Sequence, residues 1–131
     1  MAFQDDYILR TIENLVTAIG RLALGKDEVG YYLEADDHKG DQVAEKYRKL
    51  MTMVEKGDIN EAENLLFEEV PYEDLSYLEM ALSFYRYLNE YNDDYLFSNG
   101  YSREEIVDGI NAIAREFGIS GFENFVDTTM V

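Results

Sequence analysis

The stretch from Glu73 to Tyr91 carries more apolar side chains than one face of a helix can hold. Wound at 3.6 residues per turn, it leaves only a narrow polar stripe, and its apolar residues fall into two seams. The first seam consists of Leu75, Leu78, Leu82 and Tyr85. The second, which we name the aromatic seam, consists of Tyr77, Met80, Phe84, Tyr87 and Tyr91. A helix that is apolar over most of its circumference is buried on several sides. The pattern therefore predicts either the central helix of a bundle or half of an interface.

Apolar spacing predicts helices along most of the remaining chain, and no stretch alternates clearly enough to predict a strand. Turns at Gly25, Gly57 and Gly100 separate these helices at spacings typical of antiparallel hairpins. The expected helices cover about 6–24, 41–56, 59–70, 73–91 and 103–117. Residues 26–40 fit either a short helix or an irregular crossing. With a length of 131 residues, we expect one all-α domain, 1–131, of five or six helices in antiparallel hairpins. Their arrangement would be a bundle or a short solenoid.

Polar residues mark the expected helix starts. Asp5 or Asp6 can accept hydrogen bonds from the first-turn amides of the first helix. Asp58 has the position of an acidic cap before the short third helix. Ser102 and Glu105 have the spacing of a capping box, in which a hydroxyl and a carboxylate each satisfy an otherwise unpaired amide. These signals predict where three of the helices begin.

Charge is the second strong feature of the chain. Twenty-eight acidic residues face eleven basic ones, which gives a net charge of −17 at pH 7. Direct binding to DNA, RNA or an anionic membrane surface would be repulsive without a basic patch, and we expect neither partner. The acidic surface either keeps the protein soluble or attracts a basic protein partner.

No residue pattern predicts catalysis. The chain has no cysteine and a single histidine, His38, so a dedicated metal site lacks ligands. Gly25 and Lys26 lack the other residues of a phosphate-binding loop, and no serine has a nucleophile-elbow context. Adjacent carboxylates such as Glu68 and Glu69 are expected to be solvated. We therefore expect no catalytic residue, no cofactor and no metal, and a protein that is not an enzyme.

Two arginines on predicted helices, Arg10 and Arg86, have a structural and a functional interpretation. Arg86 has Glu90 one turn further on, which favours ordinary ion pairing. The alternative is that either arginine anchors a carboxylate or a phosphate.

The amino-terminal residues lack the basic and apolar regions of a signal peptide. No run reaches the ~20 apolar residues that a membrane span requires. We therefore expect a cytoplasmic protein.

The run from Glu55 to Glu63, with Gly57, Asp58 and Ala62, resembles the turn of a tetratricopeptide-type helical hairpin. The upstream residues depart from that repeat, and a repeat needs neighbours to bury its faces. The resemblance implies the geometry of a hairpin rather than a repeat array.

A second resemblance covers the opening of the chain. The residues Asp6-Tyr7-Ile8-Leu9-Arg10-Thr11-Ile12-Glu13, followed by Leu22-Ala23-Leu24-Gly25-Lys26, resemble a small bacterial family of short acidic helical proteins. The family has no assigned activity. The resemblance implies a bacterial cytoplasmic protein and transfers no catalytic residue.

The aromatic seam is the strongest candidate for a functional surface. Seven of the eleven tyrosines lie from Tyr72 to Tyr101, and tyrosine suits interfaces because it buries a ring and keeps a hydrated hydroxyl. The seam either packs inside the monomer or forms an interface with a partner, which includes a second copy of the chain in a homodimer. The leading hypothesis is a non-catalytic intracellular protein-interaction module that uses this seam or a groove between hairpins. The alternatives are an acidic decoy of a nucleic-acid-binding protein and a small-molecule binding protein with a tyrosine-lined pocket.

Overall fold

The structure is a computed structural model that describes residues 2–26, 29–30 and 41–121. These residues form six helices and no strand, which confirms the all-α prediction. The helices are α1 Ala2–Leu24, α2 Gln42–Glu55, α3 Ile59–Leu66, α4 Leu75–Asn89, α5 Asp93–Ser98 and α6 Arg103–Glu116. The predictions for residues 27–28 and 31–40 fall outside the described part of the chain, and so does His38. None of the described helices is long and apolar enough to cross a membrane.

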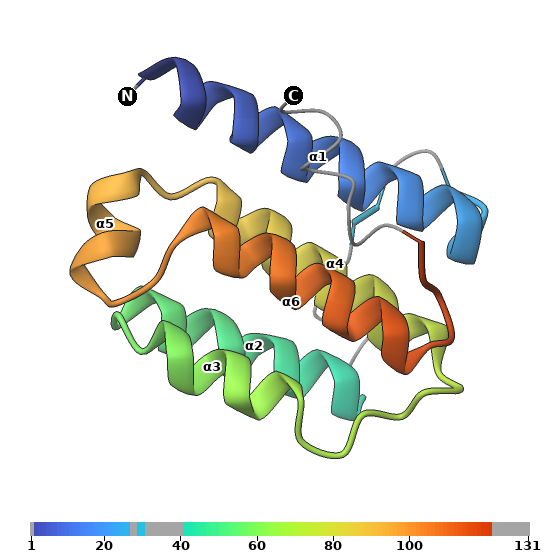
Figure 1. The fold of residues 1–131 in the computed structure, drawn as a ribbon. Helices are drawn as coiled ribbons and strands as arrows, with labels where there is room; N and C mark the ends of the chain where they lie inside the picture. The colour runs from blue at the N-terminus through green and yellow to red at the C-terminus, as the bar shows by residue number, and fades with distance from the viewer. Residues whose placement is uncertain (1, 27–28, 31–40, 122–131) are drawn as a thin grey trace.

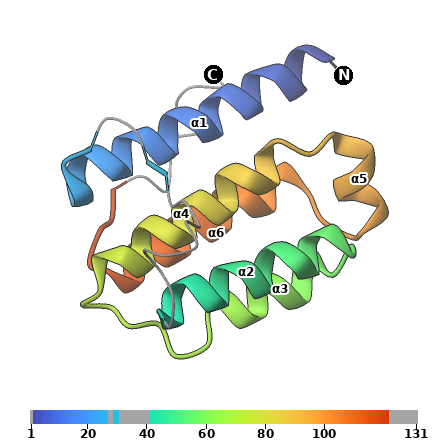
Figure 2. The same cartoon turned by 180° about the vertical axis from the view of Figure 1, so that it is seen from behind.

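The helices form three layers. In Figure 1, α4 and α6 lie side by side in the middle, with α1 on one side and the hairpin of α2 and α3 on the other. Figure 2 shows the same order from behind. α4 packs against α1, α2 and α6. The stretch with surplus apolar residues is therefore the central helix of the bundle.

Burial on three sides explains why α4 needs so few polar residues. Asp74 caps its first turn by accepting a hydrogen bond from the Ser76 amide at 3.0 Å. Both apolar seams then face the core, and ten of its residues are buried. Leu75, at the first position, is the exception and remains about half exposed. A surface helix with one apolar stripe could not fill this place, because two of its neighbours would then face polar side chains.

Polar contacts fix the direction of α1 against α4. Asn89, at the end of α4, donates to the Leu9 carbonyl of α1 at 3.0 Å. At the other end, the Lys26 amine lies 3.0 Å from the Glu79 carboxylate. The two helices are therefore antiparallel. The hairpin expected at Gly25 would have paired α1 with α2, whereas α1 packs against α4 and α6.

The hairpin of α2 and α3 turns at Gly57. Gly57 has a φ of +89°, in the left-handed region that favours glycine. The Asp58 amide donates back to the Met53 carbonyl at 2.8 Å and closes the turn. The predicted hairpin is present, but Asp58 makes no side-chain cap hydrogen bond, so its carboxylate does not cap α3. Asp58 thus occupies the predicted N-cap position, but its side-chain hydrogen bond is missing because spacing alone does not fix the rotamer.

Several helix boundaries differ from the expectation, and α3 ends at Leu66 rather than at residue 70. α1 begins at Ala2, so Asp5 and Asp6 lie inside the helix rather than at its cap. The loop expected before Gly100 contains the short helix α5. At the start of α6, the Ser102 hydroxyl accepts from the Glu105 amide at 3.3 Å, which is the first half of the predicted capping box.

Candidate functional site

The aromatic seam lies mostly inside the protein. Tyr77 is 2 % exposed, and Met80 and Phe84 are fully buried among the chain's own helices. Tyr87 and Tyr91 are only partly buried and pack against the edge of the core. The structure therefore accounts for the first three residues by packing within the monomer, the alternative that the sequence leaves open. Met80 and Phe84 are therefore not accessible to a partner in this arrangement, and Tyr77 is almost fully covered.

Tyr87 and Tyr91 belong to a ladder of three tyrosine rings at one edge of the bundle. Their hydroxyls lie 2.9 Å apart and their rings meet edge to face. The Tyr91 ring then stacks on Tyr95 of α5, with centroids 4.5 Å apart. The Tyr95 hydroxyl donates to the Val54 carbonyl of α2. Each ring has a partner within the chain, and the ladder connects α4, α5 and α2.

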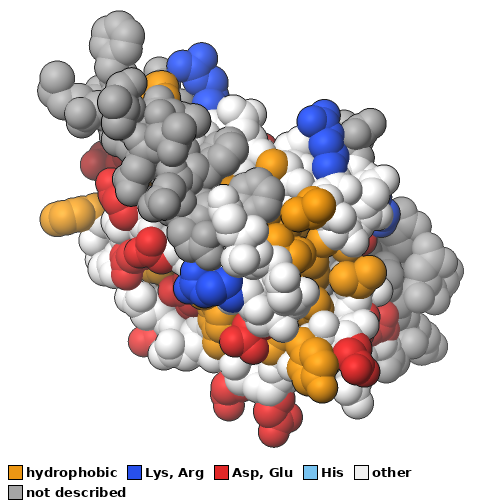
Figure 3. Space-filling view, turned by 45° about the vertical axis from the view of Figure 1, so that its right-hand side comes forward, with side chains coloured by type: hydrophobic (Ala, Val, Ile, Leu, Met, Phe, Trp, Pro, Cys, Tyr) orange, Lys and Arg blue, Asp and Glu red, His pale blue; other side chains and the backbone are white. Residues whose placement is uncertain are grey.

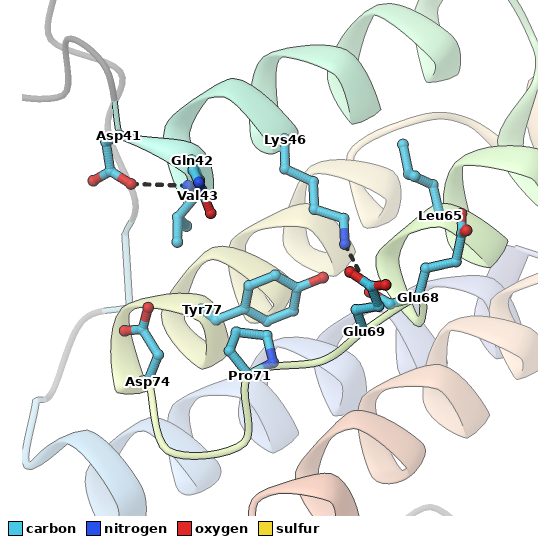
Figure 4. Close-up of a pocket in the computed structure, with 10 residues that line it drawn as sticks. All are labelled: Asp41, Gln42, Val43, Lys46, Leu65, Glu68, Glu69, Pro71, Asp74 and Tyr77. Atoms are coloured by element: carbon cyan, nitrogen blue, oxygen red, sulfur yellow. Dashed lines mark hydrogen bonds between the residues drawn. The ribbon is translucent and has the colours of Figure 1, made fainter.

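An open groove of about 640 Å³ lies between the start of α2 and the connection from α3 to α4. We name it the α2–α4 groove. Figure 4 shows its lining, with the Tyr77 ring at the centre and the Lys46 side chain reaching down from α2. The ten lining residues are Asp41, Gln42, Val43, Lys46, Leu65, Glu68, Glu69, Pro71, Asp74 and Tyr77.

Local sequence explains how the connection shapes this groove. α3 ends at Leu66, and Glu69 then adopts a left-handed backbone conformation with a φ of +50°. Pro71 cannot continue a helix, and its carbonyl accepts from the Asp74 amide at 2.8 Å to form a turn. The connection therefore bends around the start of α4 instead of covering it.

Part of the groove lining is apolar, and the Tyr77 ring lies at its centre. The Tyr77 hydroxyl donates to the Leu66 carbonyl, the last residue of α3. Burial raises the pKa of Tyr77 to about 12, so this hydroxyl keeps its proton at neutral pH. Val43, Leu65 and Pro71 supply the remaining apolar surface. A partner's aliphatic side chains could lose contact with water here.

The rim of the groove is acidic. Asp41 and Asp74 cap α2 and α4, and each accepts from a first-turn amide, at 2.8 and 3.0 Å. Glu68 and Glu69 are exposed on the connection. The lining of the groove therefore contains four carboxylates and one basic residue, Lys46.

Lys46 is already engaged inside the groove. Its amine donates to the Glu68 carbonyl at 3.0 Å and lies 5.1 Å from the centre of the Tyr77 ring. Burial lowers the pKa of the Lys46 amine, and the neighbouring carboxylates of Glu68 and Glu69 offset part of that shift. The positively charged Lys46 amine thus lies between the Glu68 carbonyl and the face of the Tyr77 ring.

A second polar cluster lies deeper, where α3, α4 and α6 meet. The hydroxyls of Tyr85 and Tyr101 both donate to the same oxygen of Glu63, at 2.6 and 3.0 Å. Burial raises the pKa of Glu63, although these two hydrogen bonds oppose the shift. These hydrogen bonds connect α3, α4 and the segment just before α6.

The two arginines singled out in the sequence have different surroundings in the structure. Arg86 pairs with Glu13 of α1, with 3.4 Å between nitrogen and oxygen, and also donates to the Val29 carbonyl. The predicted partner, Glu90, is not the one that it contacts. Arg10 is exposed on α1. Within the described ranges, no group of three or more His, Cys, Asp or Glu side chains could hold a metal ion.

Sequence patterns missed the groove because its lining comes from three separate segments. Glu68 and Glu69 were expected to be solvated, and both are exposed, but their position beside Lys46 could not be read from the sequence. The available signal was the combination of a helix-breaking proline with an acidic residue at the start of the next helix. Tyr77 is the one member of the aromatic seam that also lines the groove.

Comparison with known proteins identifies the family but no activity. No curated protein and no solved structure was found to match the chain. The sequence matches a family of unknown function, DUF6483, over residues 2–118. That match spans six described helices, including the central helix and all residues of the α2–α4 groove. The chain therefore belongs to the family of unknown function DUF6483.

Proposed function

We propose that this protein is a non-catalytic protein-interaction module that binds a basic segment of a partner protein in the α2–α4 groove. The observation that carries the proposal is an open groove of about 640 Å³ whose lining combines apolar residues with four carboxylates. A segment in which lysine or arginine alternates with aliphatic residues matches both properties. Its apolar side chains would contact Leu65 and Pro71, and its cations would lie near Glu68 and Glu69.

Charge favours a basic partner over a second copy of this chain. Each copy carries a net charge of −17, so two copies repel one another at long range. A basic partner is attracted by the same field, which raises the rate of association. Figure 3 shows one face of the molecule, on which acidic side chains lie in separate groups with basic and hydrophobic side chains between them. Binding at one place therefore needs local apolar contact in addition to charge.

The test compares two double variants with equal charge. The probe is a fluorescein-labelled peptide in which lysine alternates with leucine, and binding is followed by fluorescence anisotropy. Glu68→Gln with Glu69→Gln removes two carboxylates from the groove. Glu61→Gln with Glu116→Gln removes two exposed carboxylates outside its lining.

The groove variant should bind the peptide about three- to tenfold more weakly than the distant variant, since each exposed ion pair contributes up to about 1 kcal/mol. Equal losses in both variants would show general attraction to an acidic protein and would refute the groove. A wild-type protein that does not bind the peptide would refute the proposal as a whole. Light scattering in the same buffer reports whether self-association competes.

A further inference from the structure

The Lys46 amine sits in surroundings that would suit any single positive charge. The Lys46 amine donates a hydrogen bond to the Glu68 carbonyl oxygen at 3.0 Å. The same nitrogen lies over the Tyr77 ring, 5.1 Å from the ring centre. The Glu68 and Glu69 carboxylates act on it through space. A carbonyl, an aromatic face and nearby carboxylates together form the usual environment of a bound ammonium or guanidinium group. None of these contacts requires that the cation belong to this chain.

Lys46 also covers the part of the groove that a partner would need. Tyr77 lines the groove but is only 2 % exposed, with the Lys46 amine over its ring. Lys46 is the only basic residue among the ten that line the groove. The Lys46 side chain has a flexible four-carbon stem between the backbone and the amine. A change of rotamer can therefore move the amine into water without moving α2.

We propose that Lys46 is an internal placeholder in a monocation subsite, and that a lysine or arginine of the bound segment displaces it from the Tyr77 face. This inference rests on the proposed function, because it names the feature of the partner that the groove recognises. It reverses the usual expectation for a lysine in a binding groove. Removing the Lys46 amine should strengthen binding of a basic ligand, whereas a lysine that contacts the ligand would weaken binding when removed.

The experiment uses Lys46→Met, which keeps an unbranched apolar side chain and removes the amine. Lys49→Met is the matched control, because it makes the same charge change on the exposed side of α2, outside the groove lining. The first probe is the lysine–leucine peptide. Lys46→Met should bind it about three- to tenfold more tightly than Lys49→Met does, since the ligand no longer competes with an internal cation.

A second probe separates this inference from the proposed function. n-Butylammonium carries the end of a lysine side chain without a peptide. Added to Lys46→Met, it should give saturable NMR shifts at the Tyr77 ring, and these shifts should be weaker in wild type and in Lys49→Met. Circular dichroism establishes that each variant is folded. Lys46→Gln repeats the titration with a neutral amide in place of the amine, so that the result does not depend on one variant.

Each outcome decides one of the two ideas. Equal or weaker peptide binding by Lys46→Met relative to Lys49→Met overturns the placeholder while groove binding stands. If no variant binds the peptide, the proposed function fails, and the n-butylammonium titration still decides the subsite. Absence of saturable shifts at Tyr77 in both Lys46→Met and Lys46→Gln overturns the subsite itself.

Discussion

The Arg103 guanidinium of α6 donates to both oxygens of Asn89 on α4, at 2.9 Å to the carbonyl and 2.8 Å to the side-chain amide. Asn89 in turn donates to the Leu9 carbonyl of α1. Arg103 also donates to the Tyr91 carbonyl and pairs with Asp93, although it is only 7 % exposed. Removing a buried charge with this many partners would leave several buried polar groups without hydrogen bonds. The loss of those hydrogen bonds makes such a residue important for stability.

Replacing Arg103 with lysine should therefore destabilise the protein strongly. A lysine keeps the charge but cannot donate in several fixed directions, so at least one of the Asn89 and Tyr91 oxygens loses its donor. We expect the free energy of unfolding to fall by about 2–4 kcal/mol, measured by urea denaturation. The same change at exposed Arg48 on α2 should stay within about 0.5 kcal/mol. Equal effects at the two positions would contradict the structural role of Arg103.

Gly109 in α6 should not tolerate alanine, although alanine is the better helix former by about 1 kcal/mol. A Cβ atom at this position would overlap the Tyr85 hydroxyl and lie 2.6 Å from the Glu63 carboxylate. We expect Gly109→Ala to cost about 1–3 kcal/mol in thermal or urea unfolding, as overpacked cores do. Adding Tyr85→Phe should recover part of that loss. Asp108→Ala, on the exposed side of the same helix, is the control, and a stabilising Gly109→Ala would refute the close approach.

Glu63 should make the protein less stable as the pH rises towards neutral. Burial raises its folded-state pKa above the ordinary value of 4.5, and Glu105 and Asp108 of α6 add to the shift. The two tyrosine hydrogen bonds oppose it. A carboxyl group with a raised folded-state pKa contributes stability below its unfolded pKa and loses it as pH rises through the folded value.

Glu63→Gln removes this titration while it keeps an oxygen that can accept from Tyr85 and Tyr101. Urea unfolding at pH 5, 6 and 7 should show wild type losing stability relative to Glu63→Gln as the pH increases. The comparison between variants is needed because the whole acidic surface also titrates over this range. Glu61→Gln, on the exposed face of α3, should follow the wild-type profile. Parallel profiles for wild type and Glu63→Gln would contradict the assigned direction of the pKa shift.

Substitutions at Phe84 and Tyr87 should separate the buried part of the aromatic seam from its partly exposed edge. Phe84 is fully buried, so Phe84→Ala should cost about 3–5 kcal/mol, independent of protein concentration. Tyr87→Phe removes only the hydroxyl that meets Tyr91 and should cost about 1 kcal/mol or less. Both are measured by urea unfolding at several protein concentrations. A midpoint that rises with concentration in wild type would show that association, rather than packing within the monomer, stabilises this helix.

The positions of the long helices could be predicted because their apolar spacing and glycine stops are local signals. The central place of α4 followed from its two seams, since a helix with little polar surface must be covered. α5 could not be predicted in the same way, because six residues are too few to show a period and Asp93 and Asp94 are typical of loops. The predicted start of α1 was too late in the chain, because acidic residues such as Asp5 and Asp6 are favoured both at the cap and in the first turn of a helix.

Less of the candidate site than of the fold could be predicted from the sequence. The aromatic seam was identified correctly as a surplus of apolar surface, but sequence could not show that α1, α2 and α6 cover most of it. The groove depends on the backbone of Glu69 and the turn at Pro71, which bring Glu68 opposite Lys46. Such contacts across separate segments leave no periodic pattern. The close approach of the Tyr85 hydroxyl to Gly109 is another such contact.

The most direct test of the account is to map the basic peptide on the protein by NMR. Isotope-labelled protein is titrated with the lysine–leucine peptide, and backbone amide shifts are followed to saturation. The account predicts that the saturable shifts concentrate at Val43, Lys46, Leu65 and Tyr77. Saturable shifts centred elsewhere, or small unsaturated shifts spread over the whole acidic surface, would contradict the α2–α4 groove as the binding site.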